Sequence, residues 1–197
     1  RLPSAEAFPI VAALLQRGLD ADDPYLPWLL WWAVETQAIS QQERLLDRFA
    51  RPERWNQPLL AQQLELLVRR YAAEGTEHAE KACLRLWESA PSDQRQRVWK
   101  ALSTGLAERD QDLLRPGQGA LFAASASKTP EHTLSSSAID VSPSLAERIE
   151  TTWLAAPNEP LRLRLALQIG LPGASARAVQ LALAADEAVP VRLAAVR

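Results

Sequence analysis

The sequence predicts an all-α protein, and three observations carry this prediction. Apolar residues recur at helical spacing in one segment after another. Turns of about 2–8 residues, marked by the proline, glycine, serine and threonine residues typical of helix ends, separate these segments. A short motif also recurs, because Pro160-Leu-Arg-Leu and Pro190-Val-Arg-Leu each open an Ala/Leu-rich segment. We therefore expect antiparallel helical hairpins stacked as an α-solenoid.

The composition excludes several classes of protein. Hydrophobic residues make up 47% of the 197 positions and charged residues 23%, which is ordinary for a globular protein. The net charge of −2 argues against a general attraction to nucleic acid. No apolar run approaches the ~18–20 residues that span a bilayer. We expect no nucleic-acid partner and no membrane span. Because the chain lacks methionine and stops inside an expected helix, we also expect it to be an excised piece.

The first expected helix covers about residues 5–17. Ser4 suits the N-cap of this helix, and Gly18 suits a residue in the left-handed conformation that ends it. Apolar side chains at helical spacing indicate its buried face, and they are Phe8, Val11, Ala12 and Leu15.

The stretch LDADDPYLPWLLWWAVE, residues 19–35, is the centre of the expected fold. Asp22 or Asp23 can accept a hydrogen bond from a free N–H of its first helical turn, where proline is also tolerated. The positions from Leu26 to Val34 are apolar on every side of the helix, which is expected to end near Ile39. A helix of this kind is usually covered by its neighbours, so we expect it to be central.

A capping box is the next predicted start of a helix. Ser40 and Glu43 match the S-x-x-E pattern, and the helix is expected to end near Ala50. Residues 51–58 then form a connector that prolines fix at both ends, with Trp55 expected to pin it to the core.

Three further helices follow, and their boundaries are well marked. The first covers about residues 58–74, where Gly75 ends it and Thr76 caps the next. That next helix ends before Pro91, and Ser92 is expected to cap the third. The expected buried positions of the last two helices are Ala79, Ala82, Cys83, Leu86, Trp87, Ala90, Val98, Trp99, Leu102 and Leu106.

The character of the sequence changes near Asp110. Residues 110–142 are rich in Ser, Ala, Gly and Pro and show no sustained period, so we expect a linker or long loop, most mobile and most easily cleaved at 117–138. The expected organisation has three parts. Residues 1–109 form a helical region around the tryptophan-rich helix, residues 110–142 form this linker, and residues 143–197 form helical repeats truncated at the C-terminus.

Four helices are expected after the linker. Ser142 caps the first, Pro143 occupies its first position, and Leu145, Ile149 and Trp153 line its inner face. The segment Leu161-Arg-Leu-Arg-Leu165 alternates like a strand, but its apolar faces at helical spacing favour a helix. The last three are expected at about residues 159–169, 174–185 and 187–197.

One group of acids suggests chemistry: Asp20, Asp22, Asp23 and Glu35. As a functional hypothesis they would bind Ca²⁺ or act as a carboxylate pair. As a structural interpretation the aspartates cap a helix, and a partly buried Glu35 pairs with an arginine or with loop N–H groups. We favour the structural interpretation because no D-x-[DN]-x-[DN]-G pattern follows. We predict no catalytic, cofactor-binding or metal-binding residue, with the three aspartates as weak metal candidates.

The seven tryptophans allow two interpretations. They would form a sugar-stacking or cofactor surface, or they would belong to the core; helical spacing inside apolar stripes favours the core. We expect structural roles for Trp28, Trp31, Trp32 and Glu35. The full set is Trp28, Trp31, Trp32, Trp55, Trp87, Trp99 and Trp153.

The remaining reactive or charged side chains give weak signals. His78 and His132 lie in different regions of the chain, and neither sits near Cys83, so we expect no metal site and no Cys–His pair. Cys83, the only cysteine, is expected in the core. Four arginines of the last helices are expected on a solvent face, with an acidic partner as the alternative: Arg162, Arg164, Arg177 and Arg192.

Two stretches carry a resemblance to a known family. LDADDPYLPWLLWWAVE and RRYAAEGTEHAEKACLRLWESAP, residues 69–91, look like the helical middle region of large secreted proteins from planctomycetes and verrucomicrobia. In that family a β-propeller similar to a membrane-bound sugar dehydrogenase precedes a HEAT-like helical region, and a c-type cytochrome domain with a C-x-x-C-H haem motif follows. With the HEAT-like residues 158–197 the resemblance covers much of the chain. It implies a HEAT-like α-solenoid, although this chain has neither the propeller nor C-x-x-C-H.

The resemblance implies a non-catalytic scaffold in a larger extracytoplasmic, periplasmic redox protein. Haem c would then lie elsewhere in the parent protein, no cofactor would bind here, and the partners would be neighbouring domains or another protein. One alternative is a free-standing helical module that binds a protein or peptide. A second is a carbohydrate-active helical toroid, with tryptophans as sugar platforms and acids from 20–23 and Glu35. That enzyme needs two carboxylates about 5–10 Å apart in an open cleft.

Overall fold

The computed structural model describes residues 4–17, 23–114 and 138–184. Within these ranges the chain is all-α, with nine α-helices, one 3-10 helix and no strand. The α-helices are α1 (Ser4–Arg17), α2 (Leu26–Ala38), α3 (Gln42–Phe49), α4 (Pro58–Glu74), α5 (Glu77–Ser89), α6 (Arg95–Leu114), α7 (Pro143–Ala155), α8 (Pro160–Gln168) and α9 (Ala174–Leu183), and the 3-10 helix η1 covers Pro52–Asn56.

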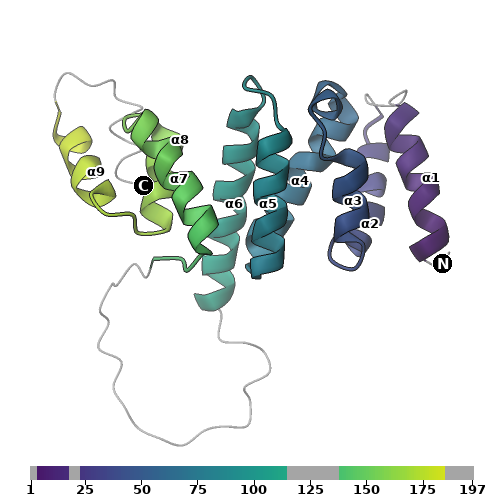
Figure 1. Cartoon of the computed structure of the whole chain (residues 1–197), viewed down its shortest axis with the longest axis horizontal. Helices are drawn as coiled ribbons and strands as arrows, with labels where there is room; N and C mark the ends of the chain where they lie inside the picture. Colours follow the sequence, from purple (N-terminus) through teal and green to yellow (C-terminus); the bar gives the residue numbers. More distant parts are fainter. Residues whose placement is uncertain (1–3, 18–22, 115–137, 185–197) are drawn as a thin grey trace, which may run out of the picture.

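The helices stand side by side in chain order along the longest axis of the molecule (Figure 1). Helix α1 lies at one end of this row and α9 at the other. Most helices pack on the next helix and on the next but one, as in the pairs α4–α5, α4–α6, α6–α8, α7–α8 and α8–α9. Contacts are therefore mainly between elements close in sequence.

One hydrophobic core runs through most of the row. It begins at Val11 in α1 and reaches Leu165 in α8 without interruption. Ile139, Leu145 and Ile149 belong to this same core, so α7 and the segment before it pack directly on the earlier helices. A smaller second cluster joins α7, α8 and α9, and its members are Trp153, Leu163, Ala166, Ala174, Ala178 and Leu181.

Helices α4 and α6 form the closest pair at the centre of the row. Gly105 of α6 lies against the α4 backbone, since a Cβ atom at this position would be 2.3 Å from the Arg69 carbonyl oxygen. It would also be 2.7 Å from the Cβ of Ala72. Such distances are far inside van der Waals contact, so only glycine lets these two helices approach so closely.

Several predicted helix boundaries are confirmed. Helix α4 covers the predicted residues, and Gly75 ends it in the left-handed conformation with φ of 67°. The Thr76 hydroxyl then accepts a hydrogen bond of 3.2 Å from the Ala79 N–H, as expected of an N-cap. Trp55 pins the connector as predicted, because its buried indole N–H donates to the Ser89 hydroxyl at 3.0 Å. Residues 161–165 are helical, within α8.

Other predicted boundaries are wrong. The capping box at Ser40 does not form: α3 begins at Gln42, and Glu43 instead pairs with Arg85 of α5. Ser92 does not cap α6, which begins at Arg95 after a turn. Helix α6 also continues to Leu114, so residues 110–114 are not part of a linker.

Segment 138–142 packs on the helices and is not a free linker. Ile139 is buried, and its N–H donates to the Gln168 carbonyl oxygen at 2.8 Å. Some expectations concern residues outside the described ranges. They are the helix end at Gly18, the second copy of the recurring motif at Pro190, and the helix expected from residue 187. The rest of the expected linker, residues 115–137, also lies outside these ranges and holds most of the expected cleavage region.

Candidate interaction surface

Helix α2 is positioned at its start by Asp23. The backbone N–H groups of Tyr25 and Leu26 both donate to one Asp23 carboxylate oxygen, Oδ1, at 2.8 Å. These two hydrogen bonds hold the pKa of Asp23 below its ordinary value of 3.8. The capping interpretation is therefore confirmed for Asp23, whereas Asp20 and Asp22 lie outside the described residues.

Side chains of α4 hold α2 at both ends. The Gln63 amide nitrogen donates to the Pro27 carbonyl oxygen at 3.1 Å. The Tyr71 hydroxyl donates to the Ala38 carbonyl oxygen at 2.9 Å, and carbonyls of a last helical turn lack partners within their own helix. Burial raises the pKa of Tyr71 above its ordinary value of 10.0, so this hydroxyl remains a donor. The orientation of α2 about its axis is fixed by these contacts.

The expectation that α2 is covered on every side is wrong. Its inner face is buried, with Trp31 8% exposed, but Trp28 is 55% and Trp32 62% exposed. Five of the seven tryptophans are in the core as predicted, whereas these two are at the surface. The exposed apolar side chains at the start, along and just after α2 are Tyr25, Trp28, Leu29, Trp32 and Ile39.

A surface pocket of about 270 Å³ opens beside this exposed face. Trp28, Trp31 and Glu35 of α2 line one side of it, and Arg69 and Arg70 of α4 line the other. Glu108 of α6 also contributes to the wall, where it accepts hydrogen bonds of 2.9 and 3.0 Å from the Arg69 Nε–H.

Glu35 is exposed and does not have the partner that the sequence suggested. In the part of the chain that the structure describes, no hydrogen bond or ion pair reaches its carboxylate. The two arginines of the pocket are engaged elsewhere, because Arg69 pairs with Glu108 and Arg70 pairs with Glu74 at 2.6 Å. The pocket therefore combines an indole wall with a free carboxylate.

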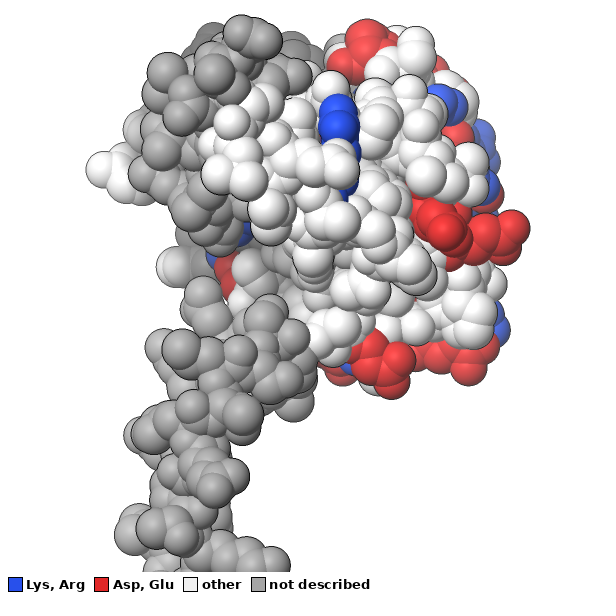
Figure 2. Space-filling model, turned by 90° about the vertical axis from the view of Figure 1, so that its left-hand side faces the viewer, with Lys and Arg blue, Asp and Glu red and all other residues white. Residues whose placement is uncertain are grey.

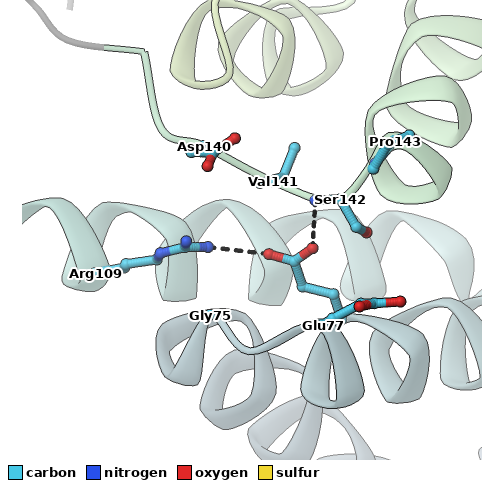
Figure 3. A pocket seen from close by; sticks show the side chains of 8 residues that line it. Gly75, Glu77, Arg109, Asp140, Val141, Ser142 and Pro143 are labelled. Atoms are coloured by element: carbon cyan, nitrogen blue, oxygen red, sulfur yellow. Dashed lines mark hydrogen bonds and ion pairs between the residues drawn. The ribbon is translucent and has the colours of Figure 1, made fainter.

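A second pocket, of about 280 Å³, surrounds a buried carboxylate that the sequence did not reveal (Figure 3). Glu80 of α5 is 2% exposed, and its Oε1 accepts a hydrogen bond of 3.0 Å from Arg109 of α6. Its Oε2 accepts a hydrogen bond of 2.6 Å from the Ser142 backbone N–H, just before α7. Both carboxylate oxygens are satisfied, so this group joins three elements.

His78 and Cys83 have different environments. The His78 side chain is 62% exposed and lies 3.8 Å from Glu43, while His132 is outside the described residues. Cys83 is buried, and its thiol donates to the Val68 carbonyl oxygen at 3.5 Å. Burial raises the pKa of this thiol, as expected of a core residue. Among the described side chains, no three metal-binding groups lie together.

The arginines of the last helices do not all face solvent. The Arg162 guanidinium lies over the Trp99 ring, 4.3 Å from its centroid, and donates to the Thr152 carbonyl oxygen at 3.1 Å. Arg162 therefore joins α8 to α6 by a cation–π contact. Arg164 is exposed, Arg177 bonds to Asn158, and Arg192 lies outside the described residues.

The end of the row that carries α9 is also poor in charge. Figure 2 shows this end face, where most described surface carries neither acidic nor basic side chains and the acidic groups lie toward the rim. Helices α7 and α9 expose Leu154, Val179 and Leu183 by 61%, 58% and 79%. At the other end α1 exposes Ile10 by 52%. Exposed apolar side chains therefore occur at both ends of the row as well as along α2.

No protein-family profile, curated protein or solved structure matches this chain. Within the described ranges, no helix has the length and apolar character required to cross a bilayer.

Proposed function

We propose that this chain is a helical scaffold that holds other protein parts in fixed relative positions. In this proposal the row of helices is a HEAT-like α-solenoid with a non-catalytic role. The observation that carries it is the order of the helices: they follow one another along the long axis, and one core continues from α1 to α8. A repeat array of this kind offers extended surfaces for binding other proteins.

The parent protein in this proposal is an extracytoplasmic redox protein. The support is the resemblance of residues 19–35 and 69–91 to the helical region that lies between a dehydrogenase-like propeller and a haem c domain. Haem would bind outside this chain, and the neighbouring domains would contact it. The coding sequence around this chain tests the redox assignment: a downstream C-x-x-C-H motif is expected, and its absence would leave the scaffold without a redox parent.

A free-standing module that binds a protein or peptide is the second candidate. The exposed aromatic side chains of α2 favour it, because tryptophan and tyrosine dominate the binding energy of many protein interfaces. The two candidates share the same surface and differ in whether the partner belongs to the same polypeptide.

The carbohydrate-enzyme alternative has weaker support. The exposed Trp28 and Trp32 fit sugar platforms, but the acids fit poorly. Asp23 is engaged in capping α2, and Glu108, the acid that shares a pocket with Glu35, is bound to Arg69. A glycosidase needs one carboxylate that is free to act as acid and another as base or nucleophile.

A further inference from the structure

Five exposed side chains at the start of, along and just after α2 form one continuous stripe. Tyr25, Trp28, Trp32, Glu35 and Ile39 follow one another at intervals of three or four residues, which places them on one side of the helix. We call these five residues the α2 stripe. Four of them are large apolar or aromatic side chains that are 43–75% exposed.

A stripe of this composition is unusual on a free surface. Single exposed apolar residues are common, but contiguous exposed apolar patches on monomeric proteins usually mark interaction sites. Tryptophan and tyrosine bury large areas with few rotatable bonds, which makes them frequent anchors of protein interfaces. The stripe therefore has the composition of a binding surface.

The negative charge of Glu35 favours a partner with a basic side chain. Glu35 is the only charged residue of α2, and within the described residues no cation pairs with it. Trp28 lines the same pocket as Glu35, and an aromatic ring attracts cations. A lysine or arginine in this pocket would meet a carboxylate and an indole together, while Arg69 and Arg70 are already paired.

Two other occupants fit less well. A second copy packed stripe to stripe about a twofold axis would bring the acidic ends, Asp23 and Glu35, toward each other, with no cation on α2 to compensate. An anionic membrane surface would be repelled by the same two acids. A basic, apolar protein segment avoids both conflicts.

We propose that the α2 stripe binds an amphipathic helical segment of a partner protein. Its apolar side chains would cover Tyr25, Trp28 and Trp32, and one arginine or lysine would enter the pocket beside Glu35. Such a segment lays its apolar face on the stripe, as in other helix-in-groove complexes. This inference rests on the proposed scaffold function, for which it names the class of partner.

The test is a selection from a displayed library of randomised helical peptides on the immobilised chain. We expect the selected peptides to carry apolar residues at helical spacing and one arginine or lysine. Replacing that basic residue by glutamate should weaken binding at least ~10-fold, since interface charge pairs are worth more than 1 kcal/mol when desolvated. With the Glu35→Lys chain the preference should reverse, so that the glutamate peptide binds better.

Matched variants show whether binding takes place on the stripe. Trp32→Ser should weaken the selected peptide at least ~10-fold, as for an interface anchor. Val179→Ser on α9 and Glu150→Lys on α7 change exposed residues of the same kinds away from α2, and both should leave the affinity unchanged. Circular dichroism melts of all four variants should match the wild type because these side chains are exposed.

Several results would overturn the inference. An unenriched selection would do so, as would a selected peptide whose affinity is unaffected by Glu35→Lys and Trp32→Ser. Trp32-dependent dimerisation in sedimentation, or Trp32-dependent binding of maltohexaose or of phosphatidylserine vesicles in place of peptide, would assign the stripe to another occupant. None of these results alters the order of helices along the row, so failure here is separable from failure of the scaffold proposal.

Discussion

Trp31 and Trp32 are adjacent in the chain but have opposite environments. Trp31 is 8% exposed and belongs to the core, whereas Trp32 is 62% exposed on the α2 stripe. The hydrogen bonds from Gln63 and Tyr71 of α4 fix which side of α2 faces inward. The two tryptophans can therefore report the orientation of the helix independently.

Trp31→Ala should lower the free energy of unfolding by about 3–5 kcal/mol, because removing a large aromatic side chain leaves a cavity in the core. Trp32→Ala should change it by no more than about 0.5 kcal/mol, as is usual at an exposed position. Urea unfolding followed by circular dichroism measures both values. Equal destabilisation by the two variants would mean that α2 is covered on both sides, contrary to the structure.

The buried carboxylate of Glu80 is bound by groups that are distant in the sequence. Its carboxylate joins α5 to Arg109 of α6 and to the Ser142 N–H before α7 (Figure 3). Glu88 lies eight residues after Glu80 on the same helix and pairs with Arg148. This pair is exposed, because the Glu88 and Arg148 side chains are 60% and 44% accessible. The two glutamates form a matched comparison.

Glu80→Ala should destabilise the protein by about 3 kcal/mol, because it leaves a mostly buried guanidinium and a backbone N–H without their acceptor. Glu88→Ala should cost less than about 1 kcal/mol, the usual range of a surface ion pair. Both values come from urea unfolding in the same buffer. Comparable losses would show that Glu80 is more solvated than its 2% exposure indicates.

At the scale of helices, close approach of α4 and α6 depends on Gly105. An alanine there has better helix propensity by about 1 kcal/mol, so propensity alone predicts that Gly105→Ala is stabilising. The structure predicts the opposite sign, because the new methyl group would meet the Arg69 carbonyl oxygen at 2.3 Å.

We expect Gly105→Ala to lower the unfolding free energy by about 1–3 kcal/mol, as for other overpacked positions. Thermal and urea unfolding give the sign directly. A stabilised variant would show that α4 and α6 are farther apart than the structure has them.

Helix boundaries were predictable where a residue with a strong local preference marks them. Pro58, Gly75 and Thr76 define the limits of α4 and the start of α5 by local chemistry alone, and those limits are confirmed. Ser40 and Ser92 carry weaker local signals, and neither caps a helix. For the predicted capping box at Ser40, a tertiary contact competes, because Glu43 bonds to Arg85 of α5 and not to a helix end.

The faces of α2 could not be predicted in the same way. Its apolar residues occupy both sides, so periodicity gives no contrast, and packing on the neighbouring helices α1 and α4 decides which side is buried. One signal was present in the sequence: the single charge of the helix, Glu35, shares a stripe with Trp28 and Trp32. The partners of Glu80 lie 29 and 62 residues away, beyond the reach of local patterns.

In the whole molecule, the described helices form an extended row and not a compact bundle (Figure 1). In the row, each step to the next layer adds roughly 8–10 Å, the usual distance between packed helices. Distances from α1 should therefore increase at every step toward α9. In a compact bundle of the same helices, some late helix would return toward α1.

Spin-label distance measurements test this claim directly. Cysteine replaces exposed residues in three pairs, Ala13 of α1 with Lys81 of α5, with Glu150 of α7 and with Ala176 of α9, while the native Cys83 is buried and should remain unlabelled. An extended row of helices gives three single-peaked distributions whose mean distances rise in that order. A label on α9 that lies nearer to α1 than the label on α7 would contradict the extended scaffold.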